Sequence, residues 1–177
     1  TLLQVSNYLA AQKYHYEIIV VSDGSTDATV AIIKDLNIEQ VQIIDNEKNM
    51  GKGYVVRQGL LLAKGEFRLF MDADNSTQIS EIEKLLPYLK NGYDIAIGSR
   101  SVDGSNITKY QPLHRRILGD MYVVLVGIIV GLWDVKDTQC GFKILSAYAV
   151  KNVLSLCRIN RWLFDPELLI IAKKRGY

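Results

Sequence analysis

Hydrophobic and polar residues alternate along the chain in blocks that switch between strand-like and helix-like patterns. Short continuous apolar runs rich in Val and Ile, such as 18–21, are typical of strands buried on both faces. Between these runs, apolar residues recur three or four positions apart, as in Val56, Leu60 and Ala63, which is the spacing of one helix face. The predicted strands are 16–23, 40–46, 66–72 and 93–100, and the predicted helices between them are 24–36, 49–65 and 80–92.

Three residues mark expected boundaries or breaks in these helices. Ser25 is predicted to cap the first helix, because a serine oxygen accepts hydrogen bonds from the first helical N–H groups. Gly65 is predicted to end the second helix. Pro87 is predicted to interrupt the third, because proline lacks the N–H that continues a helix.

The regular alternation ends after the fourth strand. A polar loop is predicted at 101–116, and a further helix from Ser146 onward. The last helix is predicted to have Asp165 as its N-cap and Pro166 at its first helical position, where the fixed φ of proline fits a helix start. Because no repeat or low-complexity linker divides the chain, a single domain across 1–177 is expected.

Strands that alternate with helices favour an α/β fold with a mostly parallel sheet covered by helices on both faces. In such sheets, ligands bind at the carboxyl ends of the strands. Asp23, Asp72 and Arg100 each lie at a predicted strand end. The sequence therefore predicts that these three side chains meet at one rim of the sheet.

Composition narrows the classes of partner. The chain has 177 residues, of which 49% are hydrophobic and 23% charged, as in ordinary globular domains. Its net charge of +2, with neither a basic patch nor a binding motif, argues against nucleic acid as a partner. Cys140 and Cys157 have neither zinc-site spacing nor the density of a disulfide scaffold, which favours a reducing, cytosolic setting.

The most apolar segment is 121–133, which is shorter than the roughly 20 residues that cross a bilayer. It fits a buried helix, and it also fits an interfacial helix that lies against lipid with Arg115 and Arg116 just before it. Both interpretations stay open at this point.

Asp72 and Asp74 form an acidic pair at the end of the third predicted strand. In extended backbone, residues i and i+2 point the same way, which places the two side chains roughly 6.6 Å apart. The two charges repel unless a cation lies near them, and the pair suits Mg²⁺ or Mn²⁺ beside an oxygen-rich ligand. One alternative is a solvated loop with an Asx turn or helix cap. Another is a haloacid-dehalogenase-like phosphatase, whose D-x-D-x-S/T motif "DADNS" matches loosely, although that class carries the motif on its first strand.

Six blocks stand in a fixed order along the chain: "VVSDGSTD", "NMGKGYVVRQG", "FMDADNST" and "GSR", followed by "DTQCGFKI" and "RWLFDPELL". In this ordered set the chain resembles the family 2 glycosyltransferases, which have a GT-A fold, the nucleotide-diphospho-sugar transferase fold. The last two blocks are similar to the dolichyl-phosphate β-glucosyltransferase branch in particular, with polyprenyl-phosphate mannosyltransferases as near neighbours. The likeness covers nearly the whole chain.

This resemblance implies roles on the donor side of the site. Asp23 contacts the nucleoside of a nucleotide-sugar, while Asp72 and Asp74 handle the ribose-diphosphate end and the metal ion, Mg²⁺ or Mn²⁺. The ion stabilises the negative charge that grows on the leaving nucleoside diphosphate. Lys52 either approaches the phosphates or is a solvated lysine at a helix start, and Asp23 by itself fits a turn residue before Gly24.

On the acceptor side, Arg100 and Arg115 match the family's arginines for the acceptor phosphate, with Lys143 as an expected partner and Arg116 as a weaker candidate. A lipid monophosphate needs no general base, because its second pKa of about 6 leaves the attacking oxygen largely ionised near neutral pH. The site then has to position the acceptor by positive charge. Without the resemblance, Arg115 and Arg116 fit an ordinary surface pair.

The chain departs from the family pattern in two places. It begins at Thr1, after the family's opening strand and its P-x-Y-N-E-like motif, so we expect a truncated N-terminus, an incomplete nucleotide pocket and an exposed sheet edge. The mannosyltransferase neighbours place a metal-binding Gln two positions after the second Asp. That position is Ser76 here, with Gln78 close by.

The resemblance implies an inverting, metal-dependent transferase that moves glucose from UDP-glucose to dolichyl or polyprenyl phosphate and so makes a lipid-linked sugar donor. The expected location is the cytoplasmic face of a membrane, in the endoplasmic reticulum of a eukaryote or the cell membrane of a prokaryote. The alternatives are a mannosyltransferase that uses GDP-mannose, and a non-catalytic nucleotide-sugar-binding or scaffold module.

Overall fold

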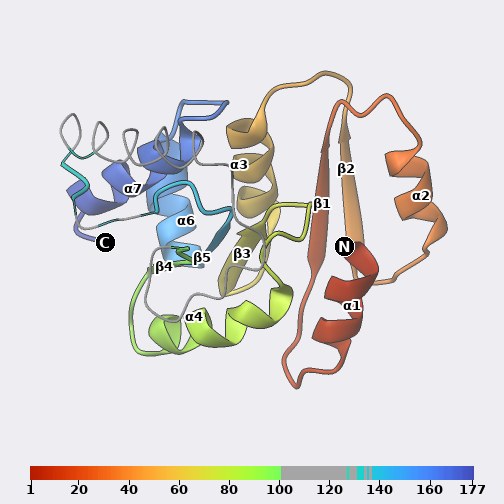
Figure 1. Ribbon diagram of the computed structural model, residues 1–177, viewed down its shortest axis with the longest axis horizontal. Coiled ribbons are helices and arrows are strands. Elements are labelled where there is room, and N and C mark those ends of the chain that lie inside the picture. The colour runs from red at the N-terminus through yellow and green to blue at the C-terminus, as the bar shows by residue number, and fades with distance from the viewer. Residues whose placement is uncertain (101–126, 128–130, 134, 136) are drawn as a thin grey trace.

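Helices and strands alternate along most of the chain in the computed structural model, which describes residues 1–100, 127, 131–133, 135 and 137–177 (Figure 1). The predicted α/β organisation is therefore confirmed. In chain order the elements are α1 (Leu2–Ala10), β1 (Ile18–Asp23), α2 (Thr29–Asp35), β2 (Val41–Asn46), α3 (Lys52–Leu62), β3 (Phe67–Met71), the 3-10 helix η1 (Ile79–Glu81), α4 (Ile82–Lys90), β4 (Ile95–Ile97), β5 (Phe142–Ser146), α6 (Ala147–Val153), the 3-10 helix η2 (Leu154–Leu156) and α7 (Phe164–Lys174).

The strands form a parallel pair and a group of three. β1 and β2 are parallel, with Ile18 opposite Val41, whereas β5 lies between β3 and β4 and is antiparallel to both. β3 and β4 therefore run in the same direction, on either side of the antiparallel strand β5, whereas the parallel pair β1 and β2 forms a separate sheet among the described residues. Among the described strands, β1 pairs only with β2. The expectation that a further strand precedes the chain stays a prediction.

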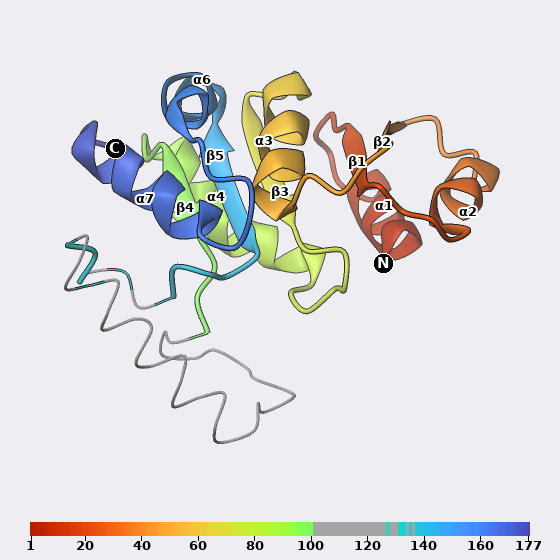
Figure 2. The ribbon, with the colours of Figure 1, turned by 90° about the horizontal axis from the view of Figure 1, so that it is seen from above.

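Helices cover the strands on both sides, as Figure 2 shows, with α3 and α6 on one side and α1 and α4 on the other. α3 contacts both β1 and β3, and so connects the two groups of strands. On the opposite side, Val5 and Leu9 of α1 belong to an apolar cluster that includes Ile18 of β1 and Leu69 of β3. Burial of these apolar side chains is the main stabilising contribution that holds the two groups together.

β5 is the centre of the core, because its side chains alternate between the two covered faces. Phe142 and Ile144 pack with α4, whereas Leu145 packs with α6 and α7, and all three are at most 1% exposed. Lys143 occupies the same face as Leu145 and is also fully buried. A lysine thus stands where the strand pattern calls for an apolar side chain.

Two of the predicted boundaries in the first half of the chain are wrong. α2 begins at Thr29 rather than after Ser25, because Asp27 accepts the N–H of Thr29 (3.0 Å) and starts the helix there. α3 ends at Leu62, three residues before Gly65. The carboxylate of Glu17 accepts the N–H of Gly65 (3.0 Å), so this backbone is held against the start of β1 instead of capping the helix.

The predicted effects of the prolines in α4 and α7 are both wrong. α4 continues through Pro87, because burial of Ile82, Leu86 and Leu89 along one face outweighs the lost hydrogen bond. α7 begins at Phe164, which places Asp165 and Pro166 inside its first turn rather than at the cap. The predicted start of α6 is confirmed, since the Ser146 hydroxyl accepts the N–H of Ala149 (3.0 Å).

Two further predictions concern the cysteines and the apolar segment. Cys140 and Cys157 are buried free thiols, as expected. None of the helices in the described ranges combines the length and the apolar character needed to cross a membrane. Most of the segment 121–133 lies outside the described residues, so its two interpretations stay predictions.

Replacing Pro87 with alanine should stabilise the protein. The change restores a backbone N–H inside α4 at an exposed position, and the gain exceeds the added freedom of the unfolded chain. We expect the free energy of unfolding in urea to rise by about 2 kcal/mol. Lys90→Ala, an exposed change in the same helix, should alter it by less than about 0.5 kcal/mol. A destabilised Pro87→Ala variant would contradict this account of α4.

Candidate active site

The acidic pair lies directly after β3, as the sequence predicted. The backbone N–H of Asp72 donates to the carbonyl of Gly141 (2.9 Å), which extends the pairing of β3 with β5 by one residue. Asp74 follows in a turn that holds Asn75 at a positive φ of 58°. The Asp72 side chain is 39% exposed and Asp74 is an exposed residue, so a ligand from solvent can reach both carboxylates.

The Asp72 carboxylate lies against the backbone of Gly141, which precedes β5. A Cβ atom at position 141 would stand 1.8 Å from Oδ2 of Asp72. No side chain fits there while the carboxylate keeps its place. The glycine of "QCGF" therefore makes room for the acidic group, a role that the sequence analysis did not identify.

Ser76 orients the second carboxylate. Oδ1 of Asp74 accepts from the Ser76 hydroxyl (2.7 Å) and from the Ser76 backbone N–H (2.9 Å). Both hydrogen bonds favour the ionised carboxylate and so lower the pKa of Asp74, and the bond from the Ser76 hydroxyl has the larger effect. The position at which the chain departs from its mannosyltransferase neighbours thus supports the acidic pair through Asp74.

Lys52, the first residue of α3, brings a positive charge to the acidic pair. Its Nζ lies 3.0 Å from Oδ1 of Asp72 and 3.6 Å from Oδ2 of Asp165. Burial works to lower the pKa of Lys52, but the carboxylates of Asp165 and Asp72 outweigh it and the pKa is raised. Lys52 is therefore a charged part of the site rather than a solvated lysine at a helix start.

Asp165 is the site residue that the sequence analysis missed. Its Oδ1 accepts from the ammonium of Lys143 (2.5 Å), while its Oδ2 faces Lys52, so that one buried carboxylate joins two lysines. Lys143 also donates to the carbonyl of Cys140 (2.6 Å). Burial lowers the pKa of Lys143, although Asp165 opposes this effect. The signal in the sequence was a carboxylate inside the apolar block "WLFDPELL", which we had assigned to a helix cap.

The predicted contact of Lys143 with a lipid phosphate does not fit this geometry. The Lys143 side chain is 0% exposed, and its ammonium is engaged by Asp165 and the Cys140 carbonyl. A phosphate would have to displace both partners to reach it. The structure favours a supporting role for Lys143 beneath the site.

Arg100 lies three residues beyond β4 and forms a two-pronged ion pair with Asp137. Its Nε and one terminal nitrogen donate to the two carboxylate oxygens at 2.8 and 3.0 Å. Burial works to raise the pKa of Asp137, but the hydrogen bonds and charge of Arg100 outweigh it, so the pKa is lowered. The Arg100 side chain remains 56% exposed. Arg115 and Arg116 lie outside the described residues.

Asp23, at the end of β1, holds the loop that leads into α3. Its Oδ1 accepts from the N–H of Met50 (2.6 Å), and its Oδ2 accepts from the N–H of Gly51 (3.0 Å). Because Lys52 follows directly, Asp23 fixes the backbone from which this lysine reaches Asp72. Contact of Asp23 with a nucleoside stays a prediction.

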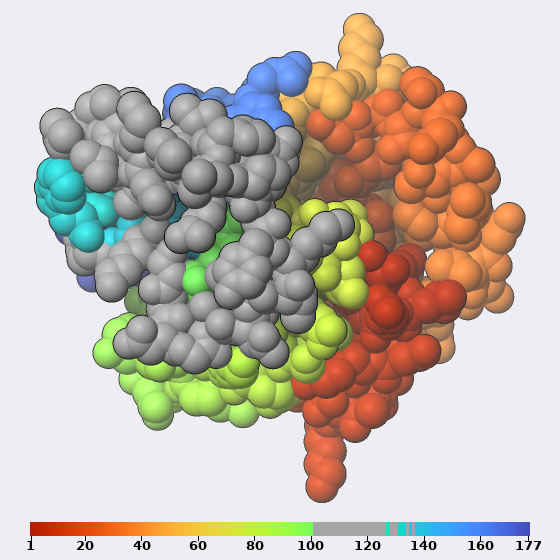
Figure 3. All heavy atoms as spheres, in the orientation of Figure 1, coloured from red at the N-terminus to blue at the C-terminus, as the bar shows by residue number. Residues whose placement is uncertain are grey.

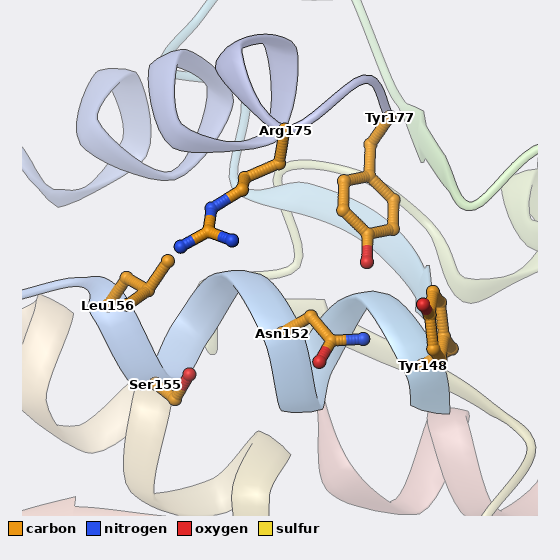
Figure 4. Close-up of a pocket in the computed structure, with 6 residues that line it drawn as sticks. All are labelled: Tyr148, Asn152, Ser155, Leu156, Arg175 and Tyr177. Carbon is orange, nitrogen blue, oxygen red and sulfur yellow. The ribbon is translucent and has the colours of Figure 1, made fainter.

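A hollow of about 390 Å³ lies elsewhere, between α6 with η2 and the end of α7 (Figure 4). Arg175 and Tyr177 point into it from above, and its floor is formed by the α6–η2 side. The described residues that line it are Tyr148, Asn152, Ser155, Leu156, Arg175 and Tyr177, and none of these is an aspartate or a glutamate. The acidic pair after β3 is not among them.

Two carboxylates, Asp72 and Asp74, are available to a cation at the rim. The described part of the chain holds no group of three or more His, Cys, Asp or Glu side chains that could bind a metal. Mg²⁺ commonly takes only one or two carboxylates and completes its coordination with waters and substrate phosphates. The donor set at the rim fits an ion bound in that way.

The chain is similar in sequence to several proteins that are named for an enzymatic activity. The chain is 39% identical over 171 residues to the dolichyl-phosphate β-glucosyltransferase ALG5C of Trichomonas vaginalis, covering 92% of this chain and 50% of the relative. It is 34% identical to the dolichyl-phosphate β-glucosyltransferases of Saccharomyces cerevisiae, covering 93% and 55%, and of Homo sapiens, covering 90% and 52%. The chain thus spans about half the length of the curated relatives it matches.

Two solved structures share the fold. S. aureus TarS, residues 1–349, aligns with a TM-score of 0.58 at 21% identity, covering 96% of this chain and 50% of that one. Mannosyl-3-phosphoglycerate synthase from Rubrobacter xylanophilus aligns with a TM-score of 0.57 at 16% identity, covering 87% and 54%. These likenesses confirm the predicted GT-A fold.

The family model for glycosyl transferase family 2 matches residues 1–154, which is most of the chain. The match includes β1, the loop before α3 and the acidic pair after β3. Enzymes of this fold family typically use a divalent metal ion, in agreement with the donor set at the rim. The chain belongs to glycosyl transferase family 2.

Proposed function

We propose that this chain is the catalytic domain of a transferase that moves glucose from UDP-glucose to dolichyl or a related polyprenyl phosphate, with inversion at the anomeric carbon. The observation that carries the proposal is the acidic pair at the carboxyl end of β3, with Lys52 held against Asp72. The curated relatives, named for glucosyl transfer to dolichyl phosphate, support this choice of acceptor and sugar. The proposed location is the cytoplasmic face of the endoplasmic reticulum membrane.

Asp72 and Asp74 are the residues that would hold Mg²⁺ or Mn²⁺. The bound ion would supply positive charge against the leaving nucleoside diphosphate. Lys52 contributes a second cation beside Asp72, in a place kept rigid by Asp165 behind it and by Asp23 through the preceding loop. Ser76 keeps Asp74 ionised and oriented.

The acceptor phosphate needs position rather than proton transfer, because it is already largely ionised near neutral pH. Arg100 is 56% exposed and is paired with Asp137, so its guanidinium can present charge to an anion from solvent while its orientation stays set. Arg115 is the second proposed contact to the acceptor phosphate. Lys143 supports the site from below through Asp165.

Asp74→Asn should abolish metal-dependent donor binding and lower turnover by roughly 10²- to 10³-fold, because it removes one charge that holds the cation. Calorimetric titration with UDP-glucose and with GDP-mannose, each with and without Mn²⁺, measures the binding. The matched control is Asp45→Asn, an exposed aspartate of β2, which should bind as the parent chain does. If the parent chain prefers GDP-mannose, the mannosyltransferase alternative is favoured. If Asp74→Asn binds the nucleotide-sugar without metal, the alternative of a non-catalytic binding or scaffold module is favoured.

Gly141→Ala should inactivate the enzyme without unfolding it. The new methyl group would occupy the place of the Asp72 carboxylate, which is free to rotate away from Lys52. We expect kcat/KM to fall at least about 10²-fold while the free energy of unfolding changes by no more than about 1 kcal/mol.

Gly59→Ala is the control for this change. It adds the same methyl group in α3, where its tight contact is a methyl of Val21 at 3.1 Å, and it should keep most of the activity. Full activity in Gly141→Ala would show that the position of Asp72 is not required.

Arg115→Ala should weaken use of the lipid phosphate and leave UDP-glucose binding near its original level. Loss of one charged hydrogen-bonding partner predicts a rise in acceptor KM of roughly tenfold or more. Arg116→Ala serves as the neighbouring comparison and should have the smaller effect. If Arg115→Ala loses donor and acceptor binding equally, Arg115 contacts the donor or has a structural role instead.

A further inference from the structure

The segment from the last residue of η2 to the start of α7, residues 156–163, exposes an unusual group of apolar side chains. We call it the 156–163 loop. Trp162 is 79% exposed and Leu163 is 50% exposed, and Leu156 and Ile159 are exposed at 36% and 37%. Large apolar side chains gathered on one exposed segment mark an interaction surface.

The loop is held in place by hydrogen bonds to α7 and α3. The carboxylate of Glu167 accepts the N–H groups of Arg158 and Ile159, both at 2.9 Å. Asn160 accepts from Arg57 through its side chain (2.6 Å) and from the Tyr54 N–H through its carbonyl (3.2 Å). The exposure of Trp162 and Leu163 is therefore built into an ordered loop.

The charge of the loop indicates the chemistry of its partner. Arg158 and Arg161 are both exposed, and the loop itself contains no acidic residue. Tryptophan prefers the boundary between lipid headgroups and acyl chains, and arginines attract anionic headgroups. Exposed Trp and Leu beside two arginines thus match a lipid surface better than an ordinary solvated loop.

The position of the loop connects it to the active site. The loop packs against the start of α3, where a Cβ on Gly53 would stand 2.5 Å from the carbonyl of Ile159. Figure 1 shows it at the top of the view, at the end of the molecule where α3 begins, and in Figure 3 blue atoms of this part of the chain protrude at the upper edge. Lys52, which reaches the acidic pair, is thus one residue away from the packing contact.

We propose that the 156–163 loop docks the protein on an anionic lipid surface. Trp162 and Leu163 enter the boundary between headgroups and acyl chains, and Arg158 and Arg161 lie among the headgroups. The proposal rests on the proposed function in one respect, namely that a lipid acceptor has to meet the rim at a membrane. Docking itself requires no turnover and can be measured separately.

The test is co-sedimentation of the 177-residue chain with vesicles of phosphatidylcholine that contain about 30% phosphatidylserine, at 0.15 M salt. Trp162→Ala should weaken binding about tenfold. Arg158→Gln and Arg161→Gln should each weaken it about fivefold on anionic vesicles and leave the weak binding to pure phosphatidylcholine unchanged. Tyr148→Ala removes another aromatic side chain, 66% exposed at the start of α6, and should bind as the parent chain does.

Titration of the same variants with UDP-glucose and Mn²⁺ separates this proposal from the proposed function. Trp162→Ala should keep donor binding, and loss of donor binding would overturn the proposal by placing the loop in the donor pocket. The docking proposal would also be overturned if the parent chain does not co-sediment with vesicles, or if Trp162→Ala binds them as strongly as the parent chain does. A dimer abolished by Trp162→Ala, without vesicle binding, would identify a protein interface instead. Vesicle docking through Trp162 in a chain that binds no donor would uphold the docking proposal and overturn only donor binding by this chain.

Discussion

The site depends on one buried carboxylate that joins two lysines. Asp165, only 3% exposed, holds the ammonium of Lys143 on one oxygen and faces that of Lys52 with the other. A buried lysine without a partner would be strongly destabilising, so Lys143 and Asp165 require each other. Because Lys143 is on β5 and Asp165 is on α7, their pairing fixes the helix against the strand, and Lys52 can then reach Asp72 from α3.

Close approach of backbones makes this arrangement possible. Gly53, one residue after Lys52, leaves room for the carbonyl of Ile159, and Gly141 leaves room for the Asp72 carboxylate. A side chain at either glycine would separate the elements that carry the charged groups. Packing and electrostatics are therefore coupled here, because the distance from Lys52 to Asp165 depends on how tightly α3 lies against the segment that leads into α7.

Local pattern was sufficient to predict much of the fold. The apolar runs that became β1, β2 and β3 were identified from continuous β-branched and aromatic residues, and Asp72 stood out because such a run ends at it. β5 was not among the predicted strands, and its antiparallel direction could not be predicted from local pattern either, since strand direction depends on how the chain returns to the sheet. Arg115 and Arg116 remain predictions.

Asp165 shows where local reasoning fails. Asp followed by Pro is a strong signal for a helix start, yet α7 begins two residues earlier than predicted, and the carboxylate bonds to a lysine 22 positions away. Lys143 was misjudged for the same reason, because a lysine among apolar residues was assigned to a ligand when its partner was a buried carboxylate. Tertiary contacts of this kind leave no periodic trace in the sequence.

The charge balance of the rim explains why a cation and a diphosphate suit it together. Among the described groups around Lys52, three carboxylates, on Asp72, Asp74 and Asp165, lie with two ammonium groups, on Lys52 and Lys143, and Arg100 is paired with Asp137. The excess negative charge is carried by Asp74, which is exposed and kept ionised by Ser76. Under the proposed function, a bare diphosphate would be repelled by this charge, whereas a bound divalent cation would reverse its sign and favour the diphosphate beside Lys52.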